Sequence, residues 1–133
     1  MQEKDLPAVM ALSYLGDAVH SLYVRGRLVA MGVSHAGELN RLSLDFVTAP
    51  KQAELAKRLL PLLTEEETGV YRRAFNHKGL SRPAHASYGE YRAATGFEAV
   101  LGALHYTGNA KRLAHLLDTV HENEFITKEE LPK

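Results

Sequence analysis

The sequence reads LSYLGDAVHSL from Leu12 to Leu22. Its apolar residues recur at steps of three and four, which predicts one helix whose inward stripe is Leu12, Leu15, Val19 and Leu22. Asp17 lies roughly opposite this stripe at about 100° of rotation per residue, among small or weakly polar neighbours. Gly16 lowers helix stability by about 1 kcal/mol relative to alanine, which indicates that something approaches the backbone closely there.

Outside this segment, helical periodicity continues along almost the whole chain. The first helix is predicted to begin near Pro7 and to end at Gly32. Ser34 is predicted to cap a second helix, Pro50 interrupts before a third, and Thr64 caps a fourth. A loop is predicted over 77–87, a long helix over 88–106, a last helix through 113–120 and a frayed tail over 123–133. No strand-like alternation competes, so the sequence predicts one all-α domain over 1–133.

A second acidic residue also has small neighbours. Glu98 lies in the stretch TGFEAVLG, which begins at Thr95 and ends at Gly102. Two helices of this kind can pack closely and bring Asp17 and Glu98 together. A divalent cation would relieve the repulsion between two converging carboxylates, and oxygen ligands suit Mg²⁺ or Mn²⁺. Such an ion can generate hydroxide and stabilise charge on a phosphate. The alternative is that both residues are ordinary exposed acids, or pair with Arg25 or Arg92.

The composition of the chain indicates the compartment in which the protein works and excludes some kinds of chemistry. The chain has 133 residues, no cysteine, and neither an apolar signal core nor an apolar run long enough to span a bilayer. These features predict a soluble, cytoplasmic protein without membrane contact and exclude thiol chemistry. His20 and His105 lie nearest the two acidic faces, but no histidine has the spacing of a metal or catalytic motif. Surface or partly packed histidines are the better interpretation.

The formal net charge is zero, which by itself disfavours nucleic acid binding. The charge is nevertheless uneven, because residues 71–92 contain five basic residues and only one acidic residue. A local basic strip on a neutral protein can still bind phosphates. A solvated loop without a partner is the alternative interpretation.

The two acidic segments, taken together, resemble the ribonuclease III family. YLGDAV at 14–19 resembles the family's signature helix, and FEAVLGAL at 97–104 resembles its second acidic helix. More specifically, the chain resembles the compact Mini-III branch, which lacks a double-stranded-RNA-binding domain. The resemblance covers roughly 12–104 and includes Tyr23–Arg25, the segment around Gln52, and a basic loop with its approach to the second acidic helix.

This resemblance implies a helical ribonuclease III endonuclease domain that forms a homodimer. It implies Mg²⁺-dependent cleavage of double-stranded RNA, with 5′-phosphate and 3′-hydroxyl products, and in the Mini-III branch the substrate is the ends of precursor 23S ribosomal RNA. Asp17 and Glu98 match the essential metal ligands, and Mn²⁺ is the expected substitute ion. RNA contacts are expected from Arg73, Asn76, Lys78 and Arg92. A ribosomal-protein partner stays open.

Two positions depart from the larger ribonuclease III enzymes. Ser13 and Thr95 stand where those enzymes have further carboxylates, which leaves the number of metals open. Phe75 replaces a usual basic residue within the basic loop. An alternative function is therefore a non-catalytic RNA-binding or ribosome-associated dimer that has kept the fold. A third is a helical interaction domain whose acidic residues are merely solvated. The natural cleavage site, and whether the 77–87 loop orders only on RNA, also stay open.

Overall fold

The computed structural model describes residues 1–79 and 86–125, and these contain helices and no strand. The all-α prediction is therefore confirmed for the described part of the chain. The elements, in order, are η1 (Glu3–Asp5), α1 (Val9–Ala30), α2 (Ala36–Val47), α3 (Ala49–Leu59), η2 (Leu60–Leu62), α4 (Glu65–Phe75), α5 (Tyr88–Tyr106) and α6 (Ala110–Val120).

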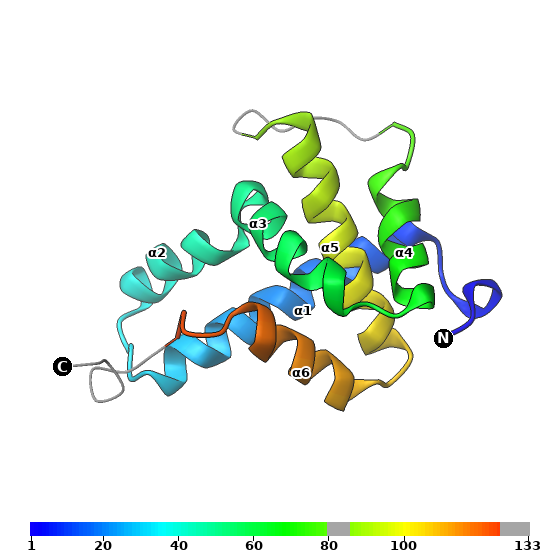
Figure 1. Cartoon of the computed structure of the whole chain (residues 1–133). Helices are drawn as coiled ribbons and strands as arrows, with labels where there is room; N and C mark the ends of the chain where they lie inside the picture. The colour runs from blue at the N-terminus through cyan, green and yellow to red at the C-terminus, as the bar shows by residue number, and fades with distance from the viewer. Residues whose placement is uncertain (80–85, 126–133) are drawn as a thin grey trace.

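Helix α5 forms the centre of the domain (Figure 1). Helices α1, α3 and α4 pack around it, and α6 lies across one end of the bundle. Phe97, Val100 and Leu101 on α5 are completely buried. Burial continues around most of the helix, because α5 has neighbours on several sides. The predicted bounds of this helix, 88–106, are confirmed.

Helices α1 and α5 cross with their backbones in direct contact. A Cβ atom placed on Gly16 would lie 1.6 Å from the carbonyl oxygen of Glu98. A Cβ atom on Gly102 would lie 1.9 Å from the carbonyl oxygen of Leu12. Neither position tolerates a side chain in this arrangement. The two glycines therefore allow the interaxial approach, as the sequence predicts for Gly16.

The buried face of α1 differs from the predicted leucine stripe. Leu12 is buried, but the Leu22 side chain is 73% exposed, so the prediction that Leu22 faces the core is wrong. The buried face is instead centred on Gly16 and includes His20 and Val24. The physical reason is the close crossing. Helix α5 packs against the small residues of α1. This close contact, rather than the periodicity of the leucines, decides which face of α1 is buried.

Among the described helices, side-chain caps begin α4 and α5, whereas α1, α2, α3 and α6 begin without one. Thr64 accepts a hydrogen bond from the Glu67 backbone N–H, and the Glu67 carboxylate accepts one from the Thr64 N–H, which confirms the predicted cap of α4. Ser34 does not cap α2, because the residue before that helix is His35 and no side chain caps it. The predicted break between the second and third helices is present but lies at Thr48, and Pro50 is in the first turn of α3.

The chain after α6 packs on the domain as far as residue 125. Phe125 is 5% exposed, and its ring stacks on Phe46 with 4.5 Å between the centroids. The Arg27 guanidinium lies 5.9 Å from the centre of the Phe125 ring. Fraying from residue 123 is therefore not observed for 123–125, because Phe125 belongs to a second apolar cluster. The rest of the predicted frayed tail, 126–133, lies outside the described residues.

Candidate active site

Asp17 and Glu98 meet beside the crossing of α1 and α5. Asp17 follows Gly16, and the carbonyl oxygen of Glu98 is the atom that Gly16 contacts. The two carboxyl groups lie within hydrogen-bonding reach of each other. The convergence predicted from two separate small-residue faces is thus present in the structure.

The carboxylate pair has unusual electrostatics. Burial raises the pKa of Glu98, and the hydrogen bond and negative charge of Asp17 raise it further, to about 9. Gln52 opposes this shift through a hydrogen bond that lowers the pKa of Glu98. Without a cation, one proton is therefore shared at this place near neutral pH. Asp17 itself is exposed, so the pair opens toward solvent.

The pair lies in a shallow hollow that three regions of the chain form. The lining residues are Met10, Ser13, Tyr14, Asp17, Val47, Ala49, Gln52, Tyr91, Ala94 and Glu98. They come from the first half of α1, the α2–α3 junction and the first half of α5. The hollow is therefore an open surface that suits a large, extended ligand better than an enclosed small molecule.

The residues present fit a hard cation with an incomplete protein shell. Within the described ranges, no three histidine or acidic side chains gather as a metal site by themselves. Two carboxylates with open solvent access match the way in which Mg²⁺ binds, through one or two carboxylates together with waters and phosphate oxygens. Burial and the neighbouring Asp17 raise the pKa of Glu98, so a cation bound beside the pair would favour the ionised form of Glu98.

Ser13 and Thr95 do not extend the acidic pair. Both are buried, at 7% and 2% exposure. The Thr95 hydroxyl donates a hydrogen bond to the Tyr91 carbonyl within its own helix, at 2.9 Å. A carboxylate at either position would have to be buried, so the small polar residues suit the close packing of α1 and α5.

The four predicted RNA-binding residues do not line this hollow. The Arg73 guanidinium forms an ion pair with Glu3 at 3.3 Å and lines a different hollow beside η1. Arg92 donates a hydrogen bond to the Phe75 carbonyl at 2.7 Å, and its guanidinium lies 4.9 Å from the Tyr88 ring centre. Asn76 follows the last residue of α4, and Lys78 is exposed two residues later. Arg92 thus connects the C-terminal end of α4 to α5 through a hydrogen bond. This contact fixes the backbone immediately before Asn76 and Lys78.

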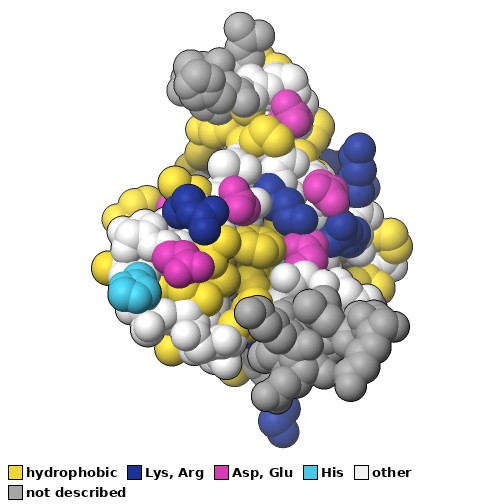
Figure 2. All heavy atoms as spheres, turned by 90° about the vertical axis from the view of Figure 1, so that its left-hand side faces the viewer, with side chains coloured by type: hydrophobic (Ala, Val, Ile, Leu, Met, Phe, Trp, Pro, Cys, Tyr) yellow, Lys and Arg dark blue, Asp and Glu magenta, His cyan; other side chains and the backbone are white. Residues whose placement is uncertain are grey.

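On the face that Figure 2 presents, charge alone does not single out an RNA-binding surface. Figure 2 shows basic and acidic side chains mixed in one band across the face that it presents. Of the predicted basic loop, residues 80–85 lie outside the described residues. Among the described helices, none combines the length and the apolar character that crossing a membrane requires.

Sequence reasoning missed the polar residues behind the carboxylates. Gln52 contributed to the family resemblance but had no predicted role, and it contacts both Glu98 and His20. His20 and His121 are fully buried rather than at the surface or partly packed. No signal in the sequence joins these two histidines, which are 101 residues apart.

Comparison with known proteins defines the class. The sequence model of the ribonuclease III domain matches residues 10–109. The chain therefore belongs to the ribonuclease III family, and it is an endoribonuclease by class. This confirms the family resemblance that the two acidic segments carry.

The more specific resemblance is also confirmed. The chain is 44% identical to Mini-ribonuclease 3 of Symbiobacterium thermophilum, over 81% of this chain and 83% of that protein. It is 40% identical to Mini-ribonuclease 3 of a Thermoanaerobacter species, over 82% of this chain and 77% of that protein. A crystal structure of a Fusobacterium nucleatum protein has the same fold, with a TM-score of 0.83, 24% identity, and coverage of 93% of this chain and 95% of that one.

Proposed function

We propose that the protein is a Mg²⁺-dependent endoribonuclease that cleaves double-stranded RNA at the Asp17–Glu98 pair. The observation that carries this proposal is the meeting of two carboxyl groups in an open hollow, with the pKa of Glu98 raised to about 9. A structural role does not explain the pair, because the carboxylates repel each other when both are ionised. A cation and a phosphate supply the charges that the site lacks.

In this proposal Asp17 and Glu98 hold the cation, with Mn²⁺ as a substitute ion. When bound, the ion supplies a water-derived nucleophile and positive charge opposite the phosphate. Gln52 donates a hydrogen bond that favours the ionised form of Glu98, which is the form that binds a cation. The shallow hollow leaves room for the RNA backbone and for waters to complete the ligand shell.

Duplex RNA is proposed to contact the end of α4 and the start of α5, through Arg73, Asn76, Lys78 and Arg92. Lys78 is exposed. Arg92 donates a hydrogen bond to the carbonyl of Phe75, the last residue of α4, and so positions the segment that follows that helix. Proteins recognise duplex RNA mostly by its shape, and their contacts with its phosphates weaken as the salt concentration rises. We expect Lys78→Ala to weaken duplex binding and to lower the slope of log affinity against log salt by about one unit. Filter binding over a salt series measures this, and an unchanged slope would remove Lys78 from the contact surface.

We further propose a homodimer. Tyr14, Leu22 and Val29 on α1 are 84%, 73% and 61% exposed, and their spacing places them along one side of the helix. Beside Leu22, an apolar groove between α1 and α6 is lined by Val19 and Leu113. A second copy would cover such apolar surface and present two equivalent sites to the two RNA strands. Sedimentation equilibrium is expected to give twice the mass of the chain, and a monomer mass at working concentration would contradict it.

The proposed natural substrate is precursor 23S ribosomal RNA at its duplex ends, and a ribosomal protein is a candidate partner. The support is similarity to proteins named Mini-ribonuclease 3. All residues proposed to bind RNA or metal lie within the matched domain, 10–109. One catalytic domain is therefore proposed to provide both binding and cleavage.

Cleavage of a perfect RNA duplex, with Mg²⁺ and then with EDTA, tests the proposed function. The parent protein is expected to cut only with the metal. Asp17→Asn is expected to lose at least about a hundredfold in cleavage rate while it keeps duplex binding, because it removes a metal ligand and no phosphate contact. Asp5→Asn, at an exposed position in η1, is the matched control and should cut like the parent.

Two results would overturn parts of the proposal. Undiminished cutting by Asp17→Asn would exclude the proposed metal site. A parent protein that binds the duplex and never cuts it would favour the non-catalytic RNA-binding function instead.

A further inference from the structure

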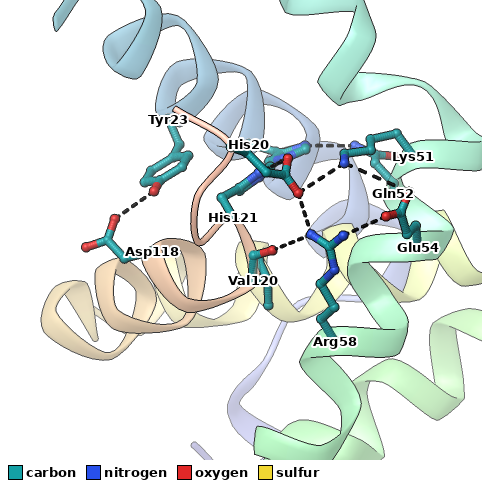
Figure 3. Close-up of polar contacts among 10 residues, drawn as sticks. His20, Tyr23, Lys51, Gln52, Glu54, Arg58, Asp118, Val120 and His121 are labelled. Atoms are coloured by element: carbon teal, nitrogen blue, oxygen red, sulfur yellow. Dashed lines mark hydrogen bonds and ion pairs between the residues drawn. The ribbon is translucent and has the colours of Figure 1, made fainter. Parts of the chain in front are cut away.

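A row of buried polar side chains leads from the carboxylate pair to the segment after α6. His20 and His121 are 0% and 2% exposed, and their Nε2 atoms are 3.0 Å apart. Figure 3 shows their rings together, with Gln52 on one side. The row connects residues that are far apart in sequence, from α1, α3 and the C-terminal segment.

Each remaining ring nitrogen also has one partner. His20 Nδ1 lies 3.0 Å from Nε2 of Gln52, and His121 Nδ1 lies 3.3 Å from Oε2 of Glu124. The other carboxylate oxygen of Glu124 accepts hydrogen bonds from Lys51, at 3.0 Å, and from Arg58. Each contact between a ring nitrogen and its partner therefore contains one hydrogen atom. Because a neutral imidazole donates from one nitrogen and accepts at the other, the direction of one hydrogen bond fixes the direction of the next.

The carboxylate of Glu124 sets this direction. Burial opposes its ionisation, but hydrogen bonds from Arg58, Lys51 and His121 bring the pKa of Glu124 below its ordinary value. An ionised carboxylate only accepts hydrogen bonds, so His121 must carry its proton on Nδ1. Burial lowers the pKa of His121, so its ring is neutral and its Nε2 accepts.

The same reasoning continues through the second ring. His20 must donate from Nε2 to His121, and burial lowers the pKa of His20 to about 3, so this ring is neutral as well. His20 Nδ1 therefore accepts, and only the amide nitrogen of Gln52 can donate to it. That nitrogen has a second N–H, and Gln52 lines the same hollow as Glu98, whose pKa it lowers by hydrogen bonding.

We propose that Glu124 is a positioning residue of the active site, which acts through His121 and His20 to keep the amide N–H of Gln52 directed toward Glu98. The inference deepens the proposed function and rests on Asp17 and Glu98 being its catalytic centre. An amide N–H can donate to a carboxylate oxygen of Glu98, whereas an amide oxygen in the same place would repel that carboxylate. Partners of this kind behind metal ligands affect metal affinity and activity by tenfold or more.

Glu124→Gln tests the inference with almost no change in shape. Lys51 and Arg58 both donate, so they retain the amide oxygen of the new side chain, and its NH₂ group then faces His121. His121 Nδ1 must now accept, which reverses each hydrogen bond in the row. Glu54→Gln is the matched control, because Glu54 binds the same Lys51 and Arg58 from the exposed side.

The first readout is the position of the ring protons in the metal-free protein, from long-range ¹⁵N–¹H correlation spectra. The parent and Glu54→Gln should carry the proton on Nε2 of His20 and on Nδ1 of His121. In Glu124→Gln both histidines should exchange tautomers. The second readout is Mn²⁺ binding, followed by paramagnetic broadening without RNA. Its dissociation constant should rise about tenfold in Glu124→Gln, and kcat on duplex RNA should fall by a similar factor with KM unchanged.

Three results would overturn the inference: the opposite tautomers in the parent, unchanged tautomers in Glu124→Gln, or exchanged tautomers with parental Mn²⁺ binding and kcat. The parent spectrum decides the first of these even if the variant does not fold. If the parent never cleaves RNA, the proposed function fails by itself. The tautomers and Mn²⁺ affinity then still decide the role of Glu124.

Discussion

Gly16→Ala is expected to lower the free energy of unfolding by about 3 kcal/mol, the upper end of the range for overpacking, and to abolish cleavage. The new methyl group would lie 1.6 Å from the carbonyl oxygen of Glu98, and backbone cannot rotate away as a side chain can. Helices α1 and α5 must therefore separate. Because Asp17 and Glu98 lie at this crossing, the same movement pulls the carboxylate pair apart.

Urea unfolding and duplex cleavage, both at a temperature where circular dichroism shows a folded variant, measure these effects. Gly26→Ala is the matched control on the same helix, because a Cβ atom at Gly26 meets nothing within 4 Å. There alanine should stabilise the protein by up to about 1 kcal/mol and leave cleavage intact. Parental stability and cleavage in Gly16→Ala would contradict the backbone crossing.

Glu98→Gln is expected to lose at least about a hundredfold in cleavage rate and, without metal, to be more stable than the parent at neutral pH. The loss of activity follows from removal of a proposed metal ligand. The gain in stability follows from the raised pKa of Glu98, since the folded protein must hold a proton there that the unfolded chain releases. A glutamine amide donates to Asp17 as the protonated acid does and needs no proton.

The stability difference between the parent protein and Glu98→Gln should depend on pH in a defined direction. The ordinary pKa of glutamate is about 4.3, and in the folded, metal-free protein it is raised to about 9. The stability that the protonated group contributes is fully present below the ordinary value and is lost as the pH rises through about 9. Chemical denaturation in EDTA from pH 5 to 9 should therefore show the parent losing stability relative to Glu98→Gln. Glu38→Gln, at an exposed position on α2, should follow the parent, and parallel curves for parent and Glu98→Gln would exclude the shared proton.

The sequence predicted the local features of the site better than the long-range ones. The acidic helices, the bounds of α5 and the Thr64 cap depend on neighbouring residues, and periodicity or spacing reveals such features. The small residues beside Asp17 also indicated the close approach correctly. The role of Leu22 was wrong, because a glycine crossing can reverse the face that an apolar stripe favours.

The remaining residues of the site depend on contacts that no local pattern contains. Gln52 meets Glu98 only because α3 packs on α5, and His20 meets His121 only after the chain returns past α6. Phe125 and Glu124 lie in a charged segment whose composition is typical of a tail, yet each is held by residues much earlier in the sequence. The proposed RNA contacts of Arg73, Asn76, Lys78 and Arg92 stay predictions.

The glycine crossing also has a consequence for protein design. Both acidic residues are placed relative to one backbone contact, Asp17 as the next residue after Gly16 and Glu98 as the residue that Gly16 touches. Two short helical segments that cross at this contact therefore carry both carboxyl groups of the pair. Grafted as a unit onto another pair of crossed helices, they are expected to bring the two carboxyl groups together, whereas a single residue inserted between glycine and aspartate rotates the carboxylate by about 100° away from its partner.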